Sequence, residues 1–227
     1  MEVRGTVALV TGASRGIGLQ LVRSLLEAGA HKVYAAARDE SSLAHAVAIE
    51  PARVSPLLLD VTVAQHIERA AKVASDVRLL INNAAILEMD GAMDVTPEVL
   101  RKHMDVNFFG MFDMCQAFGN VIALNKGGAI VNVLSLIALG NAPAMAAYSA
   151  TKAASWSMTR SMRAALRSRR VDVHAVFPGP VNTSMLAHLQ MPKASAESVA
   201  TEIVAGIVAG RDDVFPDAES RRWVENR

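Results

Sequence analysis

The chain has 227 residues, of which 52% are hydrophobic and 20% are charged, and its formal net charge is +1. This length and composition fit one globular domain with a substantial core and exclude a disordered chain. The balanced charge, without a stripe of Lys and Arg, argues against a nucleic-acid partner, and no apolar run is long enough to span a membrane. The lone cysteine, Cys115, excludes a disulfide framework, so we expect a soluble, cytoplasmic protein without a signal peptide.

The first predicted elements are a strand, a glycine-rich turn and a helix. Residues 7–10 are apolar, and the sequence from Thr11 to Gly18 reads Thr-Gly-Ala-Ser-Arg-Gly-Ile-Gly. Apolar residues then recur at helical spacing until Gly29, a natural helix stop. A glycine turn between strand and helix lets the backbone approach a pyrophosphate, which the helix N-terminus attracts. This pattern therefore predicts a dinucleotide site.

The second predicted strand, residues 33–37, is followed directly by Arg38. An acidic residue near this strand end would take a ribose 2′-hydroxyl, whereas an arginine accommodates a 2′-phosphate. A second guanidinium, Arg15, lies in the glycine turn, and two arginines suit a phosphate ester better than a diol. We therefore favour NADP(H), although both arginines would also fit a solvated surface.

Strands and helices continue to alternate up to the fourth strand. An apolar run over 54–59 ends at Asp60, whose carboxylate suits an adenine amino group or caps the next helix, expected at 64–73. The fourth strand, 79–85, turns polar at Asn82 and Asn83. This order implies a parallel sheet with right-handed crossovers and a ligand at the carboxyl ends of its strands.

A long helix is expected over about 96–124, opened by Thr96-Pro97 as N-cap and first turn. The helix is apolar on more than one face, which indicates a buried or subunit-facing element. Cys115 within it reads as a buried structural thiol. Asn107 is unusual in such a helix, and the sequence leaves open whether its amide is tied to the backbone or has a functional role.

The next strand, 129–134, delivers Ser135 to the same edge of the sheet, and a loop then leads to a helix over 148–170. Tyr148 and Lys152 are four residues apart and share one face of this helix. A nearby ammonium favours the phenolate, lowers the pKa of the tyrosine and makes it useful as a general acid or base.

The remaining elements complete an α/β pattern. A sixth strand is expected at 171–177, a rigid loop at 178–183, a short apolar lid helix at 185–191, a helix at 196–209 and a truncated last strand at 214–215. The fold class is therefore α/β: a single Rossmann-type, doubly wound domain over 1–227, with a parallel seven-stranded sheet and helices on both faces. Its dinucleotide-binding part is expected at about 5–135 and its catalytic and substrate part at about 135–227.

Seven motifs occur in a familiar order: Thr11 to Gly18, Asp60, Asn82-Asn83-Ala84, Asn107, Ser135, Tyr148 with Lys152, and Pro178-Gly179. Over its whole length the chain resembles the short-chain dehydrogenase/reductase family of NAD(P)-dependent oxidoreductases. The resemblance implies a catalytic centre of Ser135, Tyr148 and Lys152 with an assisting Asn107.

The resemblance also implies a role for each of these residues. Tyr148 is the acid in carbonyl reduction and the base in alcohol oxidation, and Ser135 hydrogen-bonds the substrate oxygen. Lys152 lowers the pKa of Tyr148 and holds the nicotinamide ribose, while Asn107 holds a water in a proton relay from Lys152 to solvent. No metal is implied. The cofactor site implied is Gly12, Ser14, Arg15, Gly16, Ile17, Gly18, Arg38, Asp60, Val61, Asn83, Ala84, Tyr148, Lys152, Pro178, Gly179, Val181 and Thr183, with Thr183 reaching the carboxamide or pyrophosphate.

Two positions depart from the family pattern. Ala85 stands where a glycine is usual, and its Cβ would be strained if the site needs a positive φ. The chain also replaces the usual final turn and longer strand with residues 211–217. Family members often build tetramers at that edge, so we expect a homodimer through the helices at about 96–124 and 148–170, with a tetramer still possible.

The residues expected to face a substrate are nearly all apolar, among them Leu87, Ile137, Met145 and Met185. A sugar would leave hydroxyl groups unpaired against them, so we hypothesise that NADPH reduces an aliphatic or aromatic ketone or aldehyde. These residues would also suit plain core packing. The alternatives for function are an NAD-dependent secondary-alcohol dehydrogenase and a dinucleotide-binding regulatory protein without turnover.

Overall fold

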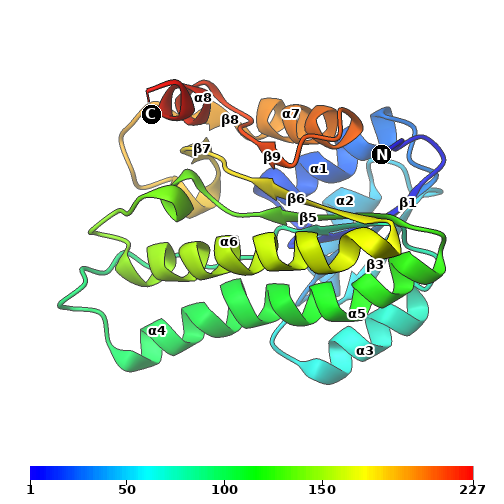
Figure 1. Cartoon of the computed structure of the whole chain (residues 1–227), viewed down its shortest axis with the longest axis horizontal. Helices are drawn as coiled ribbons and strands as arrows, with labels where there is room; N and C mark the ends of the chain where they lie inside the picture. The colour runs from blue at the N-terminus through cyan, green and yellow to red at the C-terminus, as the bar shows by residue number, and fades with distance from the viewer. Residues whose placement is uncertain (227) are drawn as a thin grey trace.

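The computed structural model describes residues 1–226 and contains one parallel seven-stranded sheet in the order β3-β2-β1-β4-β5-β6-β9 (Figure 1). Every pairing in this sheet is parallel, which confirms the predicted α/β, Rossmann-type class. The strands are β1 (Val7–Thr11), β2 (Lys32–Ala37), β3 (Val54–Leu58), β4 (Leu79–Asn82), β5 (Gly128–Val133), β6 (Val171–Val176) and β9 (Asp213–Val214).

Helices cover both faces of the sheet (Figure 1). One face carries α1, α2 and α7, and the other carries α3, α5 and α6, with α4 beyond them. The helices are α1 (Gly16–Glu27), α2 (Ala44–Val47), α3 (Ala64–Val73), α4 (Pro97–Met104), α5 (Gly110–Leu124), α6 (Ala146–Leu166), α7 (Ala196–Val208) and α8 (Ala218–Glu225). Short 3₁₀ segments follow β2, β5 and α6, at Glu40–Leu43, Leu136–Leu139 and Arg167–Arg169.

Alternation along the strands divides the core between the two faces. Ala8 and Val10 on β1 pack on the side of α1 and α7, whereas Leu9 packs on the side of α5. All three side chains are fully buried. Because β1 and β4 are covered on both faces, residues 7–10 and 79–81 are continuously apolar, which is why these runs could be predicted as buried strands.

The long helix expected at 96–124 is interrupted by a π-helical turn, Asp105–Phe109, between α4 and α5. Its predicted start is confirmed: the Thr96 hydroxyl accepts a hydrogen bond from the Val99 amide at 3.3 Å, and Pro97 occupies the first turn. Asn107 lies within the π turn. Such turns are rare and occur frequently at functional sites.

The expected lid helix at 185–191 is wrong. Only a 3₁₀ turn, Ser184–Leu186, forms there. The strands on either side of this segment, β7 (Val181–Asn182) and β8 (Ala194–Ser195), pair with each other in a separate two-stranded sheet and so hold its two ends together. The short connection between them follows the edge of a cavity instead of propagating a helix.

Helix α8 was not predicted, although it has a capping box. The Asp217 carboxylate accepts from the Ser220 amide at 2.8 Å, and the Ser220 hydroxyl accepts from the Asp217 amide at 3.2 Å. A second carboxylate oxygen of Asp217 accepts from the Gly179 amide at 2.8 Å. Asp217 therefore starts α8 and fastens it to the loop after β6.

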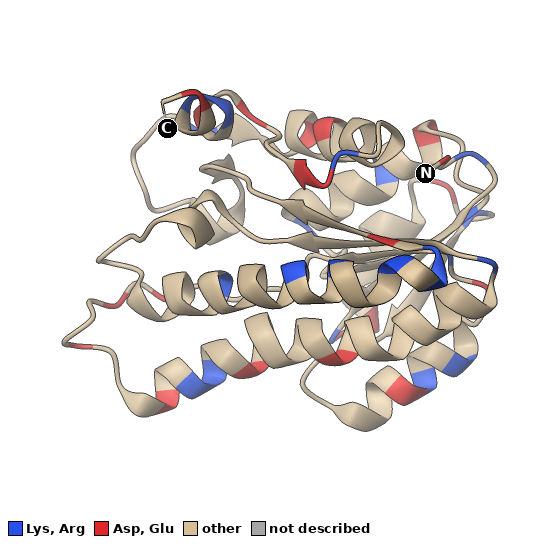
Figure 2. Cartoon of the chain, in the orientation of Figure 1, with Lys and Arg blue, Asp and Glu red and all other residues tan. Residues whose placement is uncertain are grey.

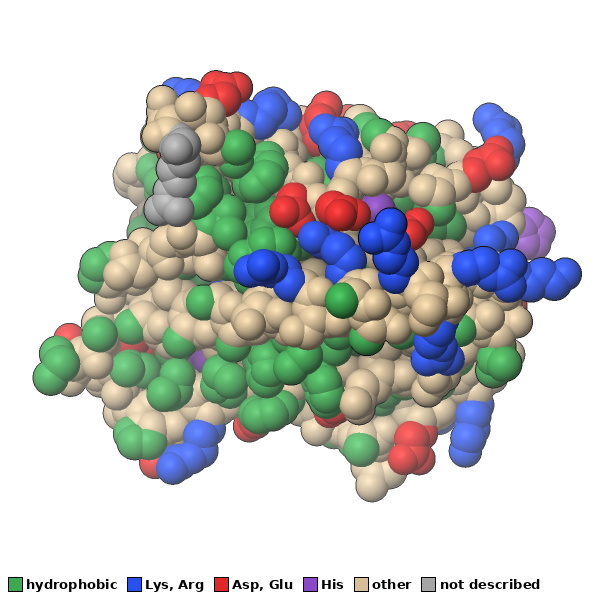
Figure 3. Space-filling view, viewed as in Figure 1, with side chains coloured by type: hydrophobic (Ala, Val, Ile, Leu, Met, Phe, Trp, Pro, Cys, Tyr) green, Lys and Arg blue, Asp and Glu red, His purple; other side chains and the backbone are tan. Residues whose placement is uncertain are grey.

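Charges of both signs are interspersed along the outer helices and loops (Figure 2). Within residues 1–226, no helix combines the length and apolar character needed to cross a membrane. Apolar side chains gather on the surface over α4, α5 and α6 (Figure 3). Leu100 and Phe109, 37% and 49% exposed, belong to this helical region. It is the region expected to form a dimer, and the dimer stays a prediction.

Candidate active site

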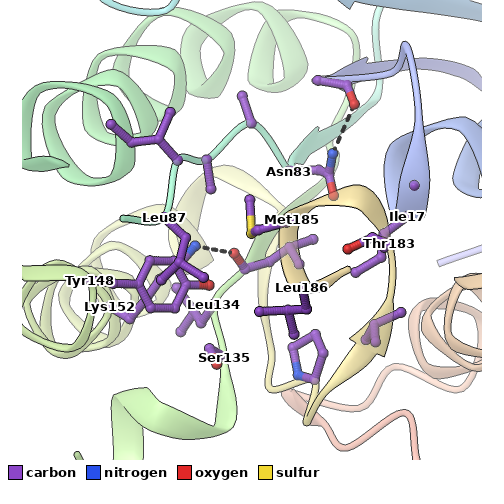
Figure 4. A pocket seen from close by; sticks show the side chains of 18 of the residues that line it. Ile17, Asn83, Leu87, Leu134, Ser135, Tyr148, Lys152, Thr183, Met185 and Leu186 are labelled. Carbon is purple, nitrogen blue, oxygen red and sulfur yellow. Dashed lines mark hydrogen bonds between the residues drawn. The ribbon is translucent and has the colours of Figure 1, made fainter. Parts of the chain in front are cut away.

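A cavity of about 870 Å³ opens at the carboxyl ends of the parallel strands. Three of the four expected catalytic residues line it, and Figure 4 shows Ser135, Tyr148 and Lys152 on one side of the space and Ile17, Asn83 and Thr183 on the other. The predicted cofactor residues that line it are Gly12, Ser14, Arg15, Gly16, Ile17, Arg38, Asp60, Val61, Asn83, Ala84, Tyr148, Lys152, Pro178, Gly179, Val181 and Thr183. Gly18 and Asn107 do not.

The glycine turn has the conformation that its residues predict. Gly12 and Gly16 have φ values of +65° and +56°, which side chains disfavour. Gly18 has a different reason: a Cβ there would lie 2.2 Å from the Gly12 carbonyl oxygen. Gly18 therefore lets helix α1 pack against the turn and does not face the cavity, so the prediction that it contacts the cofactor is not supported by this placement.

The ends of β1 and β4 are tied together by hydrogen bonds. The Thr11 hydroxyl accepts from the amides of Asn83 and Ala84 at 2.9 and 3.0 Å. The Asn83 side chain donates to the carbonyls of Thr11 and Gly12 at 2.9 and 3.2 Å. Ala85 is not strained, because among the described non-glycine residues positive φ occurs at Lys126 and Arg170. The Asn-Asn-Ala motif thus shapes the floor of the site.

Arg15 and Arg38 are exposed at the rim, on the glycine turn and just after β2. The next residue, Asp39, also lines the cavity, but its carboxylate accepts hydrogen bonds from the Ser41 amide and hydroxyl at 3.0 and 2.8 Å. Asp39 thereby caps the 3₁₀ turn Glu40–Leu43, and its carboxylate accepts hydrogen bonds within that turn. The two guanidinium groups outnumber the one carboxylate at this corner, which leaves it with an excess of positive charge.

The expectation that Asp60 caps α3 is wrong, because Val63 is the N-cap of this helix and no side chain caps it. The Asp60 carboxylate instead accepts from the Thr62 amide and hydroxyl at 2.9 and 2.7 Å, in the turn before α3. The residue also lines the cavity, where an adenine contact stays a prediction.

Tyr148 and Lys152 lie one turn apart on α6 and are buried, with exposures of 9% and 3%. The Lys152 ammonium donates to the Val133 carbonyl at 2.9 Å and lies 5.4 Å from the centroid of the Tyr148 ring. Ser135, at the end of β5, caps the following 3₁₀ turn by accepting from the Ile137 amide at 3.3 Å. The sequence spacing therefore brings these three groups to one place.

The predicted lowering of the Tyr148 pKa is wrong for this arrangement. Burial raises the pKa of Tyr148 to about 12, and a side-chain hydrogen bond with Ser135 only partly opposes this. Burial lowers the pKa of Lys152 to about 8. The expectation failed because it counted the ammonium near the phenol but not the loss of water from both groups.

The side-chain amide of Asn107 hydrogen-bonds the backbone, which is the structural one of the two interpretations that the sequence left open. Its oxygen accepts from the Ile86 amide at 2.8 Å, and its nitrogen donates to the Ile86 carbonyl at 3.0 Å and the Thr151 hydroxyl at 3.2 Å. Asn107 lines a second cavity, of about 10 Å³, which Lys152 also lines. Asn107 therefore stands behind the main site and not in it.

The residues expected to contact the substrate lie in the main cavity. Leu87, Ile137, Met145 and Met185 all line it, as do Leu186 and Leu189. Sequence reasoning missed Glu219 and Trp223 of α8, which line the same cavity. The capping box could have revealed α8, but no local signal places it there, since that depends on the bond between Asp217 and Gly179.

Within the described residues, no group of three or more His, Cys, Asp and Glu side chains could hold a metal ion. A Rossmann-type sheet, a glycine turn at a helix N-terminus and a buried Ser-Tyr-Lys group together define a dinucleotide-dependent oxidoreductase. The model of the short chain dehydrogenase family matches residues 6–194, so the chain belongs to this family. The protein is an oxidoreductase that interconverts C=O and CH–OH groups.

Comparisons with individual proteins agree on the family and differ in substrate. The chain is 36% identical to carbonyl reductase [NADPH] 2 of Sus scrofa over 186 residues, covering 82% of this chain and 75% of that protein. It is 34% identical to galactitol 2-dehydrogenase of Agrobacterium fabrum over 187 residues, covering 80% and 73%. A solved short chain dehydrogenase from Burkholderia cenocepacia J2315, in complex with NADP, superposes with a TM-score of 0.93 at 40% identity, covering 100% and 94%.

Proposed function

We propose that this enzyme is an NADPH-dependent reductase of apolar ketones or aldehydes, acting through Ser135, Tyr148 and Lys152 with Asn107 in support. The observation that carries the proposal is the buried Tyr148-Lys152 pair beside Ser135 in a cavity that the apolar side chains of Leu87, Ile137, Met145 and Met185 also line. A protein that only bound a dinucleotide would have no need of this buried pair.

The cofactor is NADP(H), and the residues present fit it. The turn from Gly12 to Gly16 lines the cavity at the N-terminus of α1, and its two glycines let the backbone come close to a ligand, which suits a pyrophosphate. Arg15 and Arg38 suit a 2′-phosphate, and Asp39, the acidic residue nearby, is occupied by Ser41. The names of the Sus scrofa and Burkholderia relatives, with NADPH and NADP, point to the same cofactor. When bound, NADPH supplies the hydride for the carbonyl carbon.

Tyr148 supplies the proton in this proposal. With a pKa of about 12, its hydroxyl is protonated at neutral pH and is ready to donate to the carbonyl oxygen during reduction. The Ser135 hydroxyl, at the same end of the cavity, hydrogen-bonds the oxygen as negative charge develops on it. The Lys152 ammonium stabilises the phenolate that remains after transfer. Because Tyr148 is protonated before the substrate binds, the site is prepared for carbonyl reduction and not for alcohol oxidation.

The proposed relay from Lys152 to solvent is supported by the second cavity. Its volume of about 10 Å³ is close to the minimum that holds one water, and its lining includes both Asn107 and Lys152. Asn107 would contribute by keeping its π turn in place through its two bonds to Ile86.

The substrate proposed is apolar because Leu87, Ile137, Met145 and Met185 offer no hydrogen bonds. The indole of Trp223 adds an aromatic wall, and the Glu219 carboxylate disfavours an anionic substrate. A second candidate is a secondary-alcohol dehydrogenase acting on a polyol, which the similarity to a galactitol dehydrogenase favours. The side chains of Leu87, Ile137, Met145 and Met185 cannot pair polyol hydroxyls, and each unpaired hydroxyl costs about 1–3 kcal/mol.

We further propose that the enzyme is a single-domain cytoplasmic homodimer. The exposed apolar residues Leu100 and Phe109 on the α4 to α5 region support pairing there (Figure 3). The unpaired, buried Cys115 fits a reducing compartment.

The decisive experiment follows NADPH and NADH oxidation over a panel of aliphatic ketones, aryl ketones, aldehydes and keto sugars, with Tyr148→Phe beside the wild type. We expect turnover of aryl ketones with NADPH and a loss of at least about 100-fold in kcat for Tyr148→Phe with NADPH binding retained. Unchanged rates in Tyr148→Phe would refute the role of the phenol. Efficient turnover of sugars, with aryl ketones inert, would favour the second candidate.

A further inference from the structure

A ladder of buried polar side chains runs through the core behind the active site, from α6 across β5 to β4. Thr159 and Asn132 are fully buried and Asn82 is 6% exposed. The Thr159 hydroxyl donates to the Ser155 carbonyl at 2.7 Å, and the Asn132 amide donates to Thr159 at 3.0 Å. The Asn82 amide in turn donates to Asn132 Oδ1 at 2.9 Å. The mechanism proposed above makes no use of this ladder.

The direction of every bond in the ladder is set by its first member. The Ser155 carbonyl only accepts, so the single proton of the Thr159 hydroxyl must point toward it. Thr159 can then only accept from Asn132, which turns the Oδ1 atom of Asn132 toward Asn82. Asn82 therefore presents its Nδ2 group to Asn132 and its Oδ1 atom to the opposite side.

The Asn82 Oδ1 atom is buried and accepts no hydrogen bond from any described residue. Asn82 also lines the 10 Å³ cavity behind the active site, together with Thr11 and Lys152. Thr11 does not supply the missing donor, because its hydroxyl proton points toward the Ile81 carbonyl at 3.4 Å. A buried carbonyl oxygen that accepts no hydrogen bond lowers the stability of the fold by about 1–3 kcal/mol. We therefore expect a donor beside it, and the cavity has room for one water.

We propose that Asn82 is a positioning residue: its Oδ1 atom accepts a hydrogen bond from one water in the second cavity and so turns a lone pair of that water toward the Lys152 ammonium. The hydrogen bonds start at Ser155 on α6 and pass through Asn132 on β5 to Asn82 on β4. The proposed water then connects Asn82 to Lys152, which lies on α6 as well. The water site follows from the ladder and the second cavity, whereas its benefit to catalysis rests on the proposed function.

On the inner side the Lys152 ammonium already donates to the Val133 carbonyl at 2.9 Å, and the water in the second cavity is a further partner for one of its remaining protons. Tyr148, on the same helix, lies in contact with Lys152, and the thiol of Cys115 contacts Asn82 from behind. Arg15, Arg38, Asp39, Asp60 and Glu219 line the main cavity. Burial is the cause of the lowered pKa of Lys152. An accepting water stabilises the ammonium and keeps that pKa from falling further.

The test compares the wild type with Asn82→Leu, which removes the acceptor at similar size, and with Cys115→Ala. Cys115→Ala is the matched control because it deletes another contact of the Asn82 amide, at 3.2 Å, and leaves Oδ1 in place. A high-resolution crystal structure of the wild type should show a water about 2.7–3.2 Å from both Asn82 Oδ1 and Lys152 Nζ. The water should persist in Cys115→Ala.

In solution, NMR titration of the Lys152 side chain should give a pKa about one unit lower in Asn82→Leu than in the wild type or Cys115→Ala. The alkaline limb of kcat/KM for carbonyl reduction should move to lower pH by the same amount. A wild-type cavity without the water, or equal Lys152 titrations in the two variants, would overturn the inference. The wild-type crystal structure decides the water site even if Asn82→Leu does not fold. Since the water and the titration are observed without substrate, absence of reductase activity would contradict the proposed function alone.

Discussion

Replacing Lys152 by methionine should stabilise the protein while it abolishes catalysis. Lys152 is 3% exposed, and burial lowers its pKa to about 8 from the ordinary lysine value of 10.5. Holding the ammonium in the folded protein at neutral pH therefore costs about 3 kcal/mol. Methionine has a similar length without the charge, and loss of the bond to the Val133 carbonyl costs about 1 kcal/mol. The net gain expected below pH 8 is about 2 kcal/mol.

The pH dependence gives this prediction its sign. Below pH 8, Lys152 is protonated in both the folded and the unfolded chain, so the wild type carries the full cost of the buried charge. Between pH 8 and 10.5 the folded protein releases this proton while the unfolded chain keeps it, so the stability of the wild type rises with pH. The advantage of Lys152→Met should therefore shrink as the pH rises.

Urea unfolding at pH 7 and about pH 9.5 measures the free energy of unfolding of the wild type, Lys152→Met and the control Lys72→Met. Lys72 is exposed on α3, and its replacement should change stability by less than about 0.5 kcal/mol. If Lys152→Met is no more stable than the wild type at pH 7, or if its advantage is equal at both values, the burial argument is refuted.

Three further predictions address the cofactor site and the cavity wall. Arg38→Asp should lower the ratio of kcat/KM for NADPH over NADH by at least about 10-fold, and a wild-type preference for NADH would contradict our interpretation of Arg15 and Arg38. Gly18→Ala, whose Cβ would lie 2.2 Å from the Gly12 carbonyl oxygen, should lose at least about 2 kcal/mol of stability in urea unfolding and weaken NADPH binding. Gly119→Ala, whose Cβ would meet nothing closer than 3.6 Å, should instead be neutral or gain up to about 1 kcal/mol. Trp223→Ala should raise KM for aryl ketones several-fold with little effect on a small aldehyde, and the exposed neighbour Val224→Ala should alter neither.

The sequence by itself determined the parallel α/β sheet and most of the site. Strands covered on both faces are largely apolar, and each one that ends in a polar or glycine-rich motif must deliver that motif to the carboxyl edge of the sheet. Gly12, Asn83 and Ser135 could therefore be assigned to one cavity, and the spacing of Tyr148 and Lys152 placed both on one face of α6.

Only the tertiary structure decided the environment of these groups. Burial raised the Tyr148 pKa that the local charge pattern predicted to fall, because desolvation depends on neighbours far away in the sequence. Gly18 serves the packing of α1, and Asp39 is occupied by its own turn. Trp223 reaches the cavity through a bond between Asp217 and Gly179, residues 38 positions apart, and no local pattern encodes such a contact.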